Sequence, residues 1–130
     1  MNIGAASQQS GVPRKAIRYY ESVGLIPEAA RTPSGYRTYD HADIDTLRFV
    51  QRARGLGFSV RHVGALLGLW NDRARASADV KELAMAHVEE IDQKITELQD
   101  IRNTLMHLTE RCHGDYRPEC PILEEFAGRK

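Results

Sequence analysis

The chain has 130 residues, of which 42% are hydrophobic and 28% charged, and its 18 Lys and Arg balance 18 Asp and Glu. This composition is typical of a small soluble globular protein. The longest nearly apolar run, residues 63–70, is too short to span a bilayer, and two cysteines cannot make a disulfide-rich scaffold.

The opening residues contain no basic segment followed by an apolar core, so we expect a cytoplasmic protein without membrane contact.

The neutral total charge hides an uneven distribution of charge along the chain. Up to residue 75 there are 11 Lys and Arg against 6 Asp and Glu, and beyond it 7 against 12, so the two parts carry +5 and −5. A local positive potential attracts a polyanion, so this split predicts a basic anion-facing module joined to an acidic one. Chance clustering of charge is the alternative.

The first part of the chain predicts two short helices joined by a glycine turn. One runs from Ile3 to Ser10 and ends at Gly11. The second begins near Pro13, where a missing N–H costs little, and ends at Gly24. Its apolar positions recur at helical spacing: Ala16, Ile17, Tyr20 and Val23. Two helices around a glycine turn are a helix-turn-helix candidate.

The segment 31–40 predicts a hairpin in which Gly35 takes a positive φ at the turn. Basic and aromatic residues mark both this hairpin and the second helix. They are Arg14, Lys15, Arg18, Tyr19 and Tyr20 on the helix, and Arg31, Tyr36, Arg37 and Tyr39 on the hairpin. Arg and Lys on a leading helix reach phosphates and guanine edges, and a winged reader needs a second basic element to grip flanking phosphates. A solvated basic face is the alternative for the helix alone.

Two further helices are predicted, over residues 41–55 and from Ser59 onward. Their apolar residues recur at helical spacing: Ile44, Leu47, Val50 and Ala53 in the first, and Val63, Leu66, Leu67 and Trp70 in the second. We expect these to be core helices of a first module.

Residues 77–112 contain neither glycine nor proline, so a continuous helix there would be roughly 54 Å long at about 1.5 Å per residue. Its apolar residues step by three or four, as in a coiled-coil seam: Ala84, Val88, Ile91, Ile95, Leu98, Ile101, Leu105 and Leu108. So small a first module cannot bury this stripe alone, and we expect a homodimer through this helix. A helix folded back on its own domain is the alternative.

Cys112 closes the long helix, and Cys120 follows in a short loop. In a reducing cytosol a close cysteine pair is more often a metal or redox site than a structural disulfide. Two thiolates alone favour a monovalent coinage metal, whereas zinc usually takes four ligands. His113 could supply a third ligand and Asp115 or Glu119 a poor fourth, although we favour a plain loop role for the histidine. A regulatory disulfide is the competing interpretation.

The run from Gly11 to Val60, with its GYRTY wing motif and its LGF turn, resembles the DNA-binding half of the MerR family of bacterial transcriptional activators. The long helix and the terminal cysteine loop match that family's dimerisation and effector region. The loop CHGDYRPEC, followed by Pro-Ile-Leu, is similar to the copper-efflux regulators of the CueR type. The resemblance implies a mostly α fold in three parts. These are a winged helix-turn-helix DNA-binding domain over residues 1–75, a dimerisation helix in an antiparallel coiled coil over 76–111, and a metal-binding loop with a short helix over 112–130.

The resemblance also implies roles for single residues. Cys112 and Cys120 would bind the metal, and Ser77 from the other subunit would close the site. The family's divalent-metal sensors carry a cysteine at the position of Ser77, and a serine hydroxyl cannot compensate a second positive charge. The implied effector is therefore Cu(I), with Ag(I) or Au(I) as alternatives, and a helix N-cap is the other role for Ser77. The residues that would grip DNA are Lys15, Arg18, Tyr20, Arg31, Tyr36 and Arg37.

The implied function is transcriptional activation of copper efflux and detoxification genes in response to the metal. The partners would be double-stranded promoter DNA and RNA polymerase, which engages once metal binding distorts the DNA. A thiol-redox regulator that uses the same cysteines is one alternative, and a non-DNA coiled-coil zinc module is another. No nucleophile with a base, glycine-rich phosphate loop or paired carboxylates stands out, so we do not expect an enzyme.

Overall fold

The computed structural model describes residues 1–128, which fall into two compact units. The first unit runs from Met1 to Ala84, and the second begins at Met85. Helices dominate both units, and the described residues contain a single two-stranded sheet. The predicted mostly α fold is confirmed.

The first unit opens with two helices, α1 (Ile3–Ser10) and α2 (Arg14–Ser22). The side chain of Asn2 caps α1, and Gly11 ends it at φ 78°, a left-handed conformation that glycine adopts without a Cβ clash. Pro13 precedes the first turn of α2, where its missing N–H costs little. The predicted helix-turn-helix is therefore present, with Gly11 after its first helix and Pro13 before its second.

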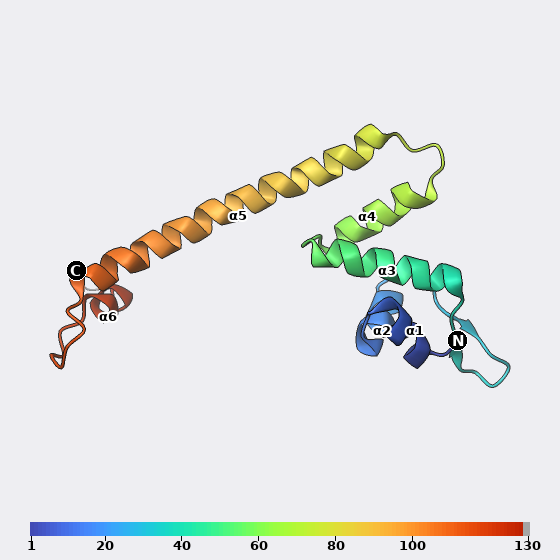
Figure 1. Ribbon diagram of the computed structural model, residues 1–130, viewed down its shortest axis with the longest axis horizontal. Coiled ribbons are helices and arrows are strands. Elements are labelled where there is room, and N and C mark those ends of the chain that lie inside the picture. The colour runs from blue at the N-terminus through green and yellow to red at the C-terminus, as the bar shows by residue number, and fades with distance from the viewer. Residues whose placement is uncertain (129–130) are drawn as a thin grey trace. The chain divides into compact units, whose positions relative to one another are not determined.

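The wing is a short hairpin in which β1 (Ala30–Arg31) pairs antiparallel with β2 (Arg37–Thr38). Gly35 sits in its turn at φ 88°, as predicted. The N–H of Thr32 donates to the carbonyl of Tyr36 at 2.8 Å and closes the turn. The hairpin lies beside the N-terminus of the chain (Figure 1).

Two longer helices complete the first unit, α3 (His41–Gly55) and α4 (Val60–Asn71). Asp40 and Asp43 form a capping box at the start of α3, and the N–H of Asp43 holds the pKa of Asp40 below its usual value. Ser59 caps α4 by accepting a hydrogen bond from a backbone N–H in its first turn. In the ribbon, α3 packs against both α1 and α4 (Figure 1).

One hydrophobic core holds this unit together. Its fully buried large side chains are Ile17, Ile44, Leu47, Val12, Val50 and Val63. Two predicted core residues lie elsewhere. Val23, at the C-cap of α2, is 48% exposed. Trp70 is 42% exposed and stacks on Phe49 with ring centroids 4.6 Å apart.

The long helix α5 (Ser77–Arg111) has 35 residues, close to the predicted span. At its start the N–H of Asp79 donates to the carbonyl of Ala76 at 3.1 Å.

The first compact unit runs to Ala84 and so includes the first turns of α5. The reason is that Val80 and Ala84 from the first turns of α5 line an apolar hollow together with Phe49 and Leu66. The first turns of this helix thus pack with the first unit.

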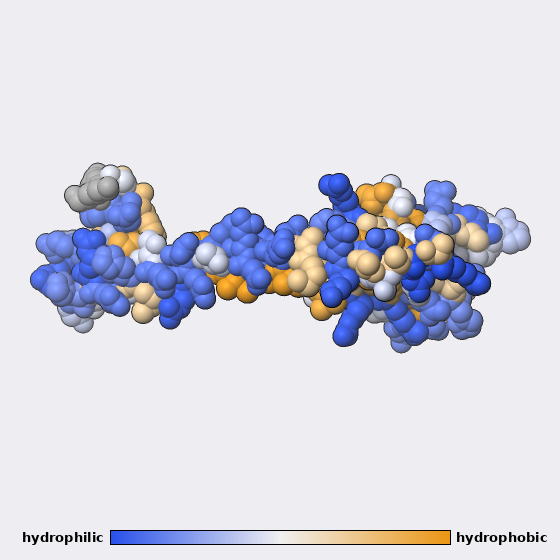
Figure 2. All heavy atoms as spheres, turned by 90° about the horizontal axis from the view of Figure 1, so that it is seen from above, coloured by the Kyte–Doolittle hydropathy of each residue, from blue (hydrophilic) through white to orange (hydrophobic). Residues whose placement is uncertain are grey.

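The second unit contains the rest of α5 and a short helix, α6 (Pro121–Phe126). Leu108 is the one α5 residue that is buried, and the other seam residues in this unit are exposed. Figure 2 shows apolar side chains gathered along one side of α5, next to a hydrophilic flank. None of the helices described in residues 1–128 is both long and apolar enough to cross a membrane.

Candidate functional site

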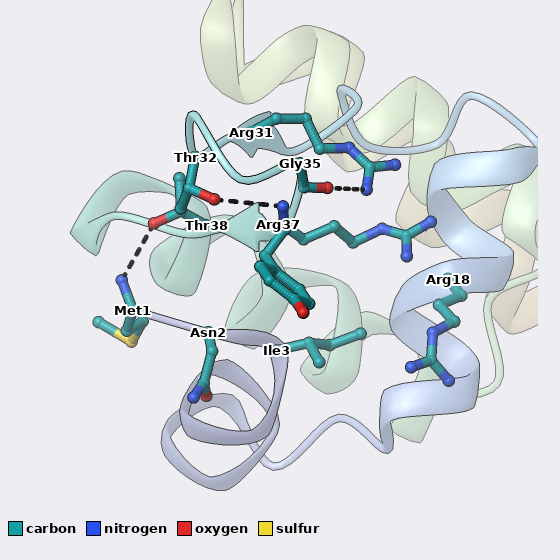
Figure 3. Close-up of a pocket in the computed structure, with 10 residues that line it drawn as sticks. Met1, Asn2, Ile3, Arg18, Arg31, Thr32, Gly35, Arg37 and Thr38 are labelled. Atoms are coloured by element: carbon teal, nitrogen blue, oxygen red, sulfur yellow. Dashed lines mark hydrogen bonds between the residues drawn. The ribbon is translucent and has the colours of Figure 1, made fainter.

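Three arginines from separate elements meet at one hollow of the first unit. Arg18 on α2, Arg31 on β1 and Arg37 on β2 all line a cavity of about 570 Å³. Their guanidinium groups extend to the same side of the hairpin (Figure 3). Guanidinium groups match phosphate geometry and remain charged at any physiological pH, so this hollow suits a phosphate.

The exposed residues of α2 continue this surface. Lys15 and Arg18 are exposed, and Tyr19 is 51% exposed. Tyr20 is only 8% exposed and belongs to the hydrophobic core, because it stands three residues after the buried Ile17 on the inner face. Its ring centroid is 5.9 Å from that of the exposed Tyr19, and the DNA contact expected of Tyr20 stays a prediction.

The hairpin holds Arg31 and Tyr36, two of the residues predicted on it, in different ways. Arg31 donates from Nη1 to the carbonyl of Gly35 at 3.1 Å, which ties its side chain across the turn. Tyr36 is 74% exposed, and its N–H donates to Oγ1 of Thr32 at 3.2 Å. The wing therefore carries an exposed aromatic ring and an arginine that is hydrogen-bonded to the turn.

A carboxylate that was not singled out from the sequence ties α2 to the wing. Oε2 of Glu21 accepts from Nε of Arg37 at 3.0 Å, and its Oε1 accepts from the hydroxyl of Tyr39 at 2.7 Å. Burial and this hydrogen bond raise the pKa of Tyr39, so its hydroxyl remains a donor at neutral pH. The only hint in the sequence is one acidic residue on an otherwise basic helix, and its distant partners cannot be found from spacing.

Cys112 and Cys120 bound the loop between α5 and α6. Both thiols are free and partly exposed. Cys112 follows the last turn of α5, where its N–H donates to the carbonyl of Thr109 at 3.1 Å, and Cys120 is the residue that precedes α6. Each cysteine therefore lies at a helix end.

The donor set of this loop is small. Asp115, considered as a poor fourth ligand, is instead bound by Nε of Arg117 at 2.8 Å and by the N–H of Arg117 at 2.9 Å. Across residues 1–128, no group of three or more His, Cys, Asp or Glu side chains is placed to hold a metal ion. His113 is exposed in the loop, and Ser77 is exposed at the start of α5. Two thiols without further donors fit a soft monovalent ion better than a four-coordinate zinc.

Comparison with known proteins agrees with this geometry. The chain matches the model of the MerR HTH family regulatory proteins over residues 1–68 and the model described as MerR, DNA binding over residues 44–108. It is 58% identical over 127 residues to the Heavy metal-dependent transcription regulator 2 of Rhizobium meliloti (strain 1021), in a match that covers 98% of this chain and 86% of the relative. It is 41% identical over 128 residues to the HTH-type transcriptional regulator CueR of Salmonella typhimurium (strain LT2), with 98% and 93% covered.

A solved structure shows the same fold. The crystal structure of the transcription regulator PbrR691 from Ralstonia metallidurans CH34 in complex with lead(II) matches with a TM-score of 0.85 and 30% identity. The match covers 97% of this chain and 98% of that one. The resemblance seen in the sequence is thus confirmed, and the chain belongs to the MerR family of helix-turn-helix transcriptional regulators.

Proposed function

We propose that the protein is a cytoplasmic, homodimeric transcriptional activator that senses Cu(I), with Ag(I) or Au(I) as further ligands, and switches on copper efflux and detoxification genes. The observation that carries this proposal is the loop with two free thiols and no further metal donor assembled among the described residues. Metal-responsive regulation is supported by the relatives, one named a heavy metal-dependent regulator and another named CueR.

The competing effector is a divalent ion, since PbrR691 was solved with lead(II). Ser77 argues against it, because the family's divalent sensors are expected to carry a cysteine at that position. A third thiolate would compensate the second positive charge, and a serine hydroxyl does not. Cys112 and Cys120 would therefore be the metal ligands, with Ser77 of the other subunit as the selectivity residue.

DNA contact is assigned to the first unit. Lys15, Arg18 and Tyr19 would face the DNA from α2, where Arg and Lys reach phosphates and base edges. Arg31, Tyr36 and Arg37 would contact the flanking backbone from the wing. The shared hollow of Arg18, Arg31 and Arg37 supports this assignment, because it joins helix and wing in one cationic surface.

Dimerisation is assigned to α5. The seam residues Ile95, Leu98 and Ile101 are 46%, 64% and 56% exposed in the single chain. A second copy would bury this stripe, and a dimer with two-fold symmetry would match a palindromic promoter site. The polar flank seen beside the stripe in Figure 2 would stay in solvent.

Activation requires two states of the dimer that differ in how they hold the DNA. Metal binding would favour the state in which the promoter is distorted, so that RNA polymerase engages both of its recognition elements. Bending a DNA site of about 20–30 base pairs costs on the order of 1–6 kcal/mol. The difference in metal affinity between the two states must supply that free energy, since a ligand shifts an equilibrium only by its differential affinity.

The test is in vitro transcription from the protein's own promoter under reducing conditions, titrated with Cu(I), Ag(I) and Zn(II). We expect Cu(I) and Ag(I) to activate and Zn(II) not to. Cys112→Ser and Cys120→Ser should abolish the response while DNA binding persists, since the thiols and the arginines lie in different units. Tyr116→Ser is the matched loop control, because this side chain is fully exposed and the thiols remain.

Two results would contradict the proposal. Activation of either cysteine variant by Cu(I) would refute the ligand assignment. Activation of the metal-free protein by an oxidant, with loss of both free thiols, would instead favour the thiol-redox regulator.

A further inference from the structure

We propose that Glu21 is a positioning residue of the DNA-binding surface, which acts by holding Arg37 through its Nε. The guanidinium group then presents its two terminal amino groups to the hollow that it shares with Arg18 and Arg31 (Figure 3). This inference rests on the proposed DNA contacts and adds a residue that touches no DNA itself.

Glu21 and Arg37 differ in how far their side chains are exposed. The side chain of Glu21 is 5% exposed, whereas that of Arg37 is 30% exposed. The carboxylate is thus enclosed, and the cation reaches the surface. An Arg side chain has five N–H donors in a fixed fork, so binding through Nε leaves the Nη groups oriented for a phosphate.

Glu21 also joins two residues of the wing to α2. It accepts from Arg37 on β2 and from the hydroxyl of Tyr39 just beyond that strand. Charge-assisted hydrogen bonds of this kind are stronger than neutral ones. One buried carboxylate therefore sets the position of the wing against the helix that carries Arg18, and a phosphate held by both elements depends on that position.

Simple electrostatics and a positioning role predict opposite effects of Glu21 on DNA affinity. A negative charge beside a phosphate-binding surface weakens DNA binding by like-charge repulsion, so its removal should tighten the complex. A positioning role predicts that removal loosens the complex. The sign of the change in affinity therefore distinguishes the two.

The experiment measures the affinity of the full chain for a promoter duplex over a range of salt concentrations. Glu21→Gln keeps the shape of the side chain and removes its charge. Glu28→Gln is the matched control, because Glu28 is exposed in the same unit and its substitution removes the same charge. We expect the control to bind equally well or slightly more tightly. We expect Glu21→Gln to bind roughly fivefold more weakly and to lower the salt slope by up to about 0.9 for each phosphate that the variant no longer neutralises.

A double-mutant cycle shows whether Glu21 acts through Arg37. In an Arg37→Gln background, Glu21→Gln should change the affinity less than about twofold, whereas an equal loss in both backgrounds would mean a general effect on folding. Thermal unfolding of each variant is recorded alongside. If Glu21→Gln does not fold, Arg37→Lys answers the question instead. Lysine keeps the charge but has no rigid fork with which to bind Glu21 and a phosphate together. The DNA affinity of Arg37→Lys should therefore fall close to that of Arg37→Gln.

The outcomes separate this inference from the proposed function. If the wild-type chain shows no salt-sensitive binding to promoter DNA, the proposed function fails. If the wild type binds and Arg37→Gln weakens binding, but Glu21→Gln matches Glu28→Gln, only the positioning role is overturned. Wild-type affinity in Arg37→Lys overturns it as well.

Discussion

Ile17→Ala should unfold the DNA-binding unit well below the temperature at which the native unit unfolds. Ile17 is fully buried in the core, whereas the next residue of α2, Arg18, is exposed. Its packing against the core therefore holds the helix that carries the DNA-contacting residues. Ile17→Ala therefore destabilises the helix that carries the DNA-contacting residues without changing the charge of the unit.

The magnitude follows from its complete burial. Three carbon atoms leave the core, which costs about 2.4 kcal/mol at about 0.8 kcal/mol per CH₂. The cavity that remains raises the cost to about 3–4 kcal/mol, within the usual range for such substitutions. For a domain of this size, about 1 kcal/mol lowers Tm by about 4–8 °C, so we expect a fall of roughly 12–30 °C.

Fluorescence provides a local assay, because the chain has one tryptophan and Trp70 stacks on Phe49 within the first unit. Thermal unfolding followed at this residue reports the DNA-binding unit rather than the long helix. Val23→Ala is the matched control at the end of α2, since Val23 is 48% exposed. We expect the control to change stability by no more than about 0.5 kcal/mol. Equal effects of the two substitutions would refute the assignment of Ile17 to the core.

Three further predictions concern a tyrosine, the dimer seam and the metal response. The folded-state pKa of Tyr39 lies above its ordinary value of 10.0, so the stability it contributes is complete below pH 10 and is lost as pH rises through the folded value. Urea unfolding of Tyr39→Phe should show a smaller alkaline decline than the wild type, and identical pH curves would count against the hydrogen bond. Leu98→Glu, at a seam position that is 64% exposed, should yield a folded monomer in sedimentation, and a dimer of unchanged affinity would exclude α5 as the interface. Ser77→Cys should extend the transcriptional response to divalent ions, and an unchanged metal profile would remove this residue from the selectivity argument.

Local signals in the sequence were sufficient where the physics is local. Ser59 begins its helix because a side-chain oxygen next to a helix start accepts an otherwise unbonded N–H. Gly11 and Gly35 mark turns because both need a positive φ.

Tyr20 shows where a resemblance and a pattern disagree. Its helical spacing with Ile17 predicts the core, whereas its place in a basic and aromatic segment predicts DNA contact. Tyr20 is 8% exposed and packs in the core, while its neighbour Tyr19 is on the exposed side. Periodicity located the buried face of α2, because burial follows from which face of the helix meets the other helices. The DNA contact that the resemblance implies for Tyr20 stays a prediction.

The sequence by itself determined the helices, the hairpin, the charge division and the two-thiol loop, since each depends on residues close together in the chain. Only the tertiary structure decided which distant groups meet. It brought Arg18, Arg31 and Arg37 to one hollow and placed Glu21 against Arg37 and Tyr39. It also extended the first unit into α5, beyond the change in composition. Such contacts depend on how helices and hairpin pack around a shared core, and no spacing along the chain encodes that packing directly.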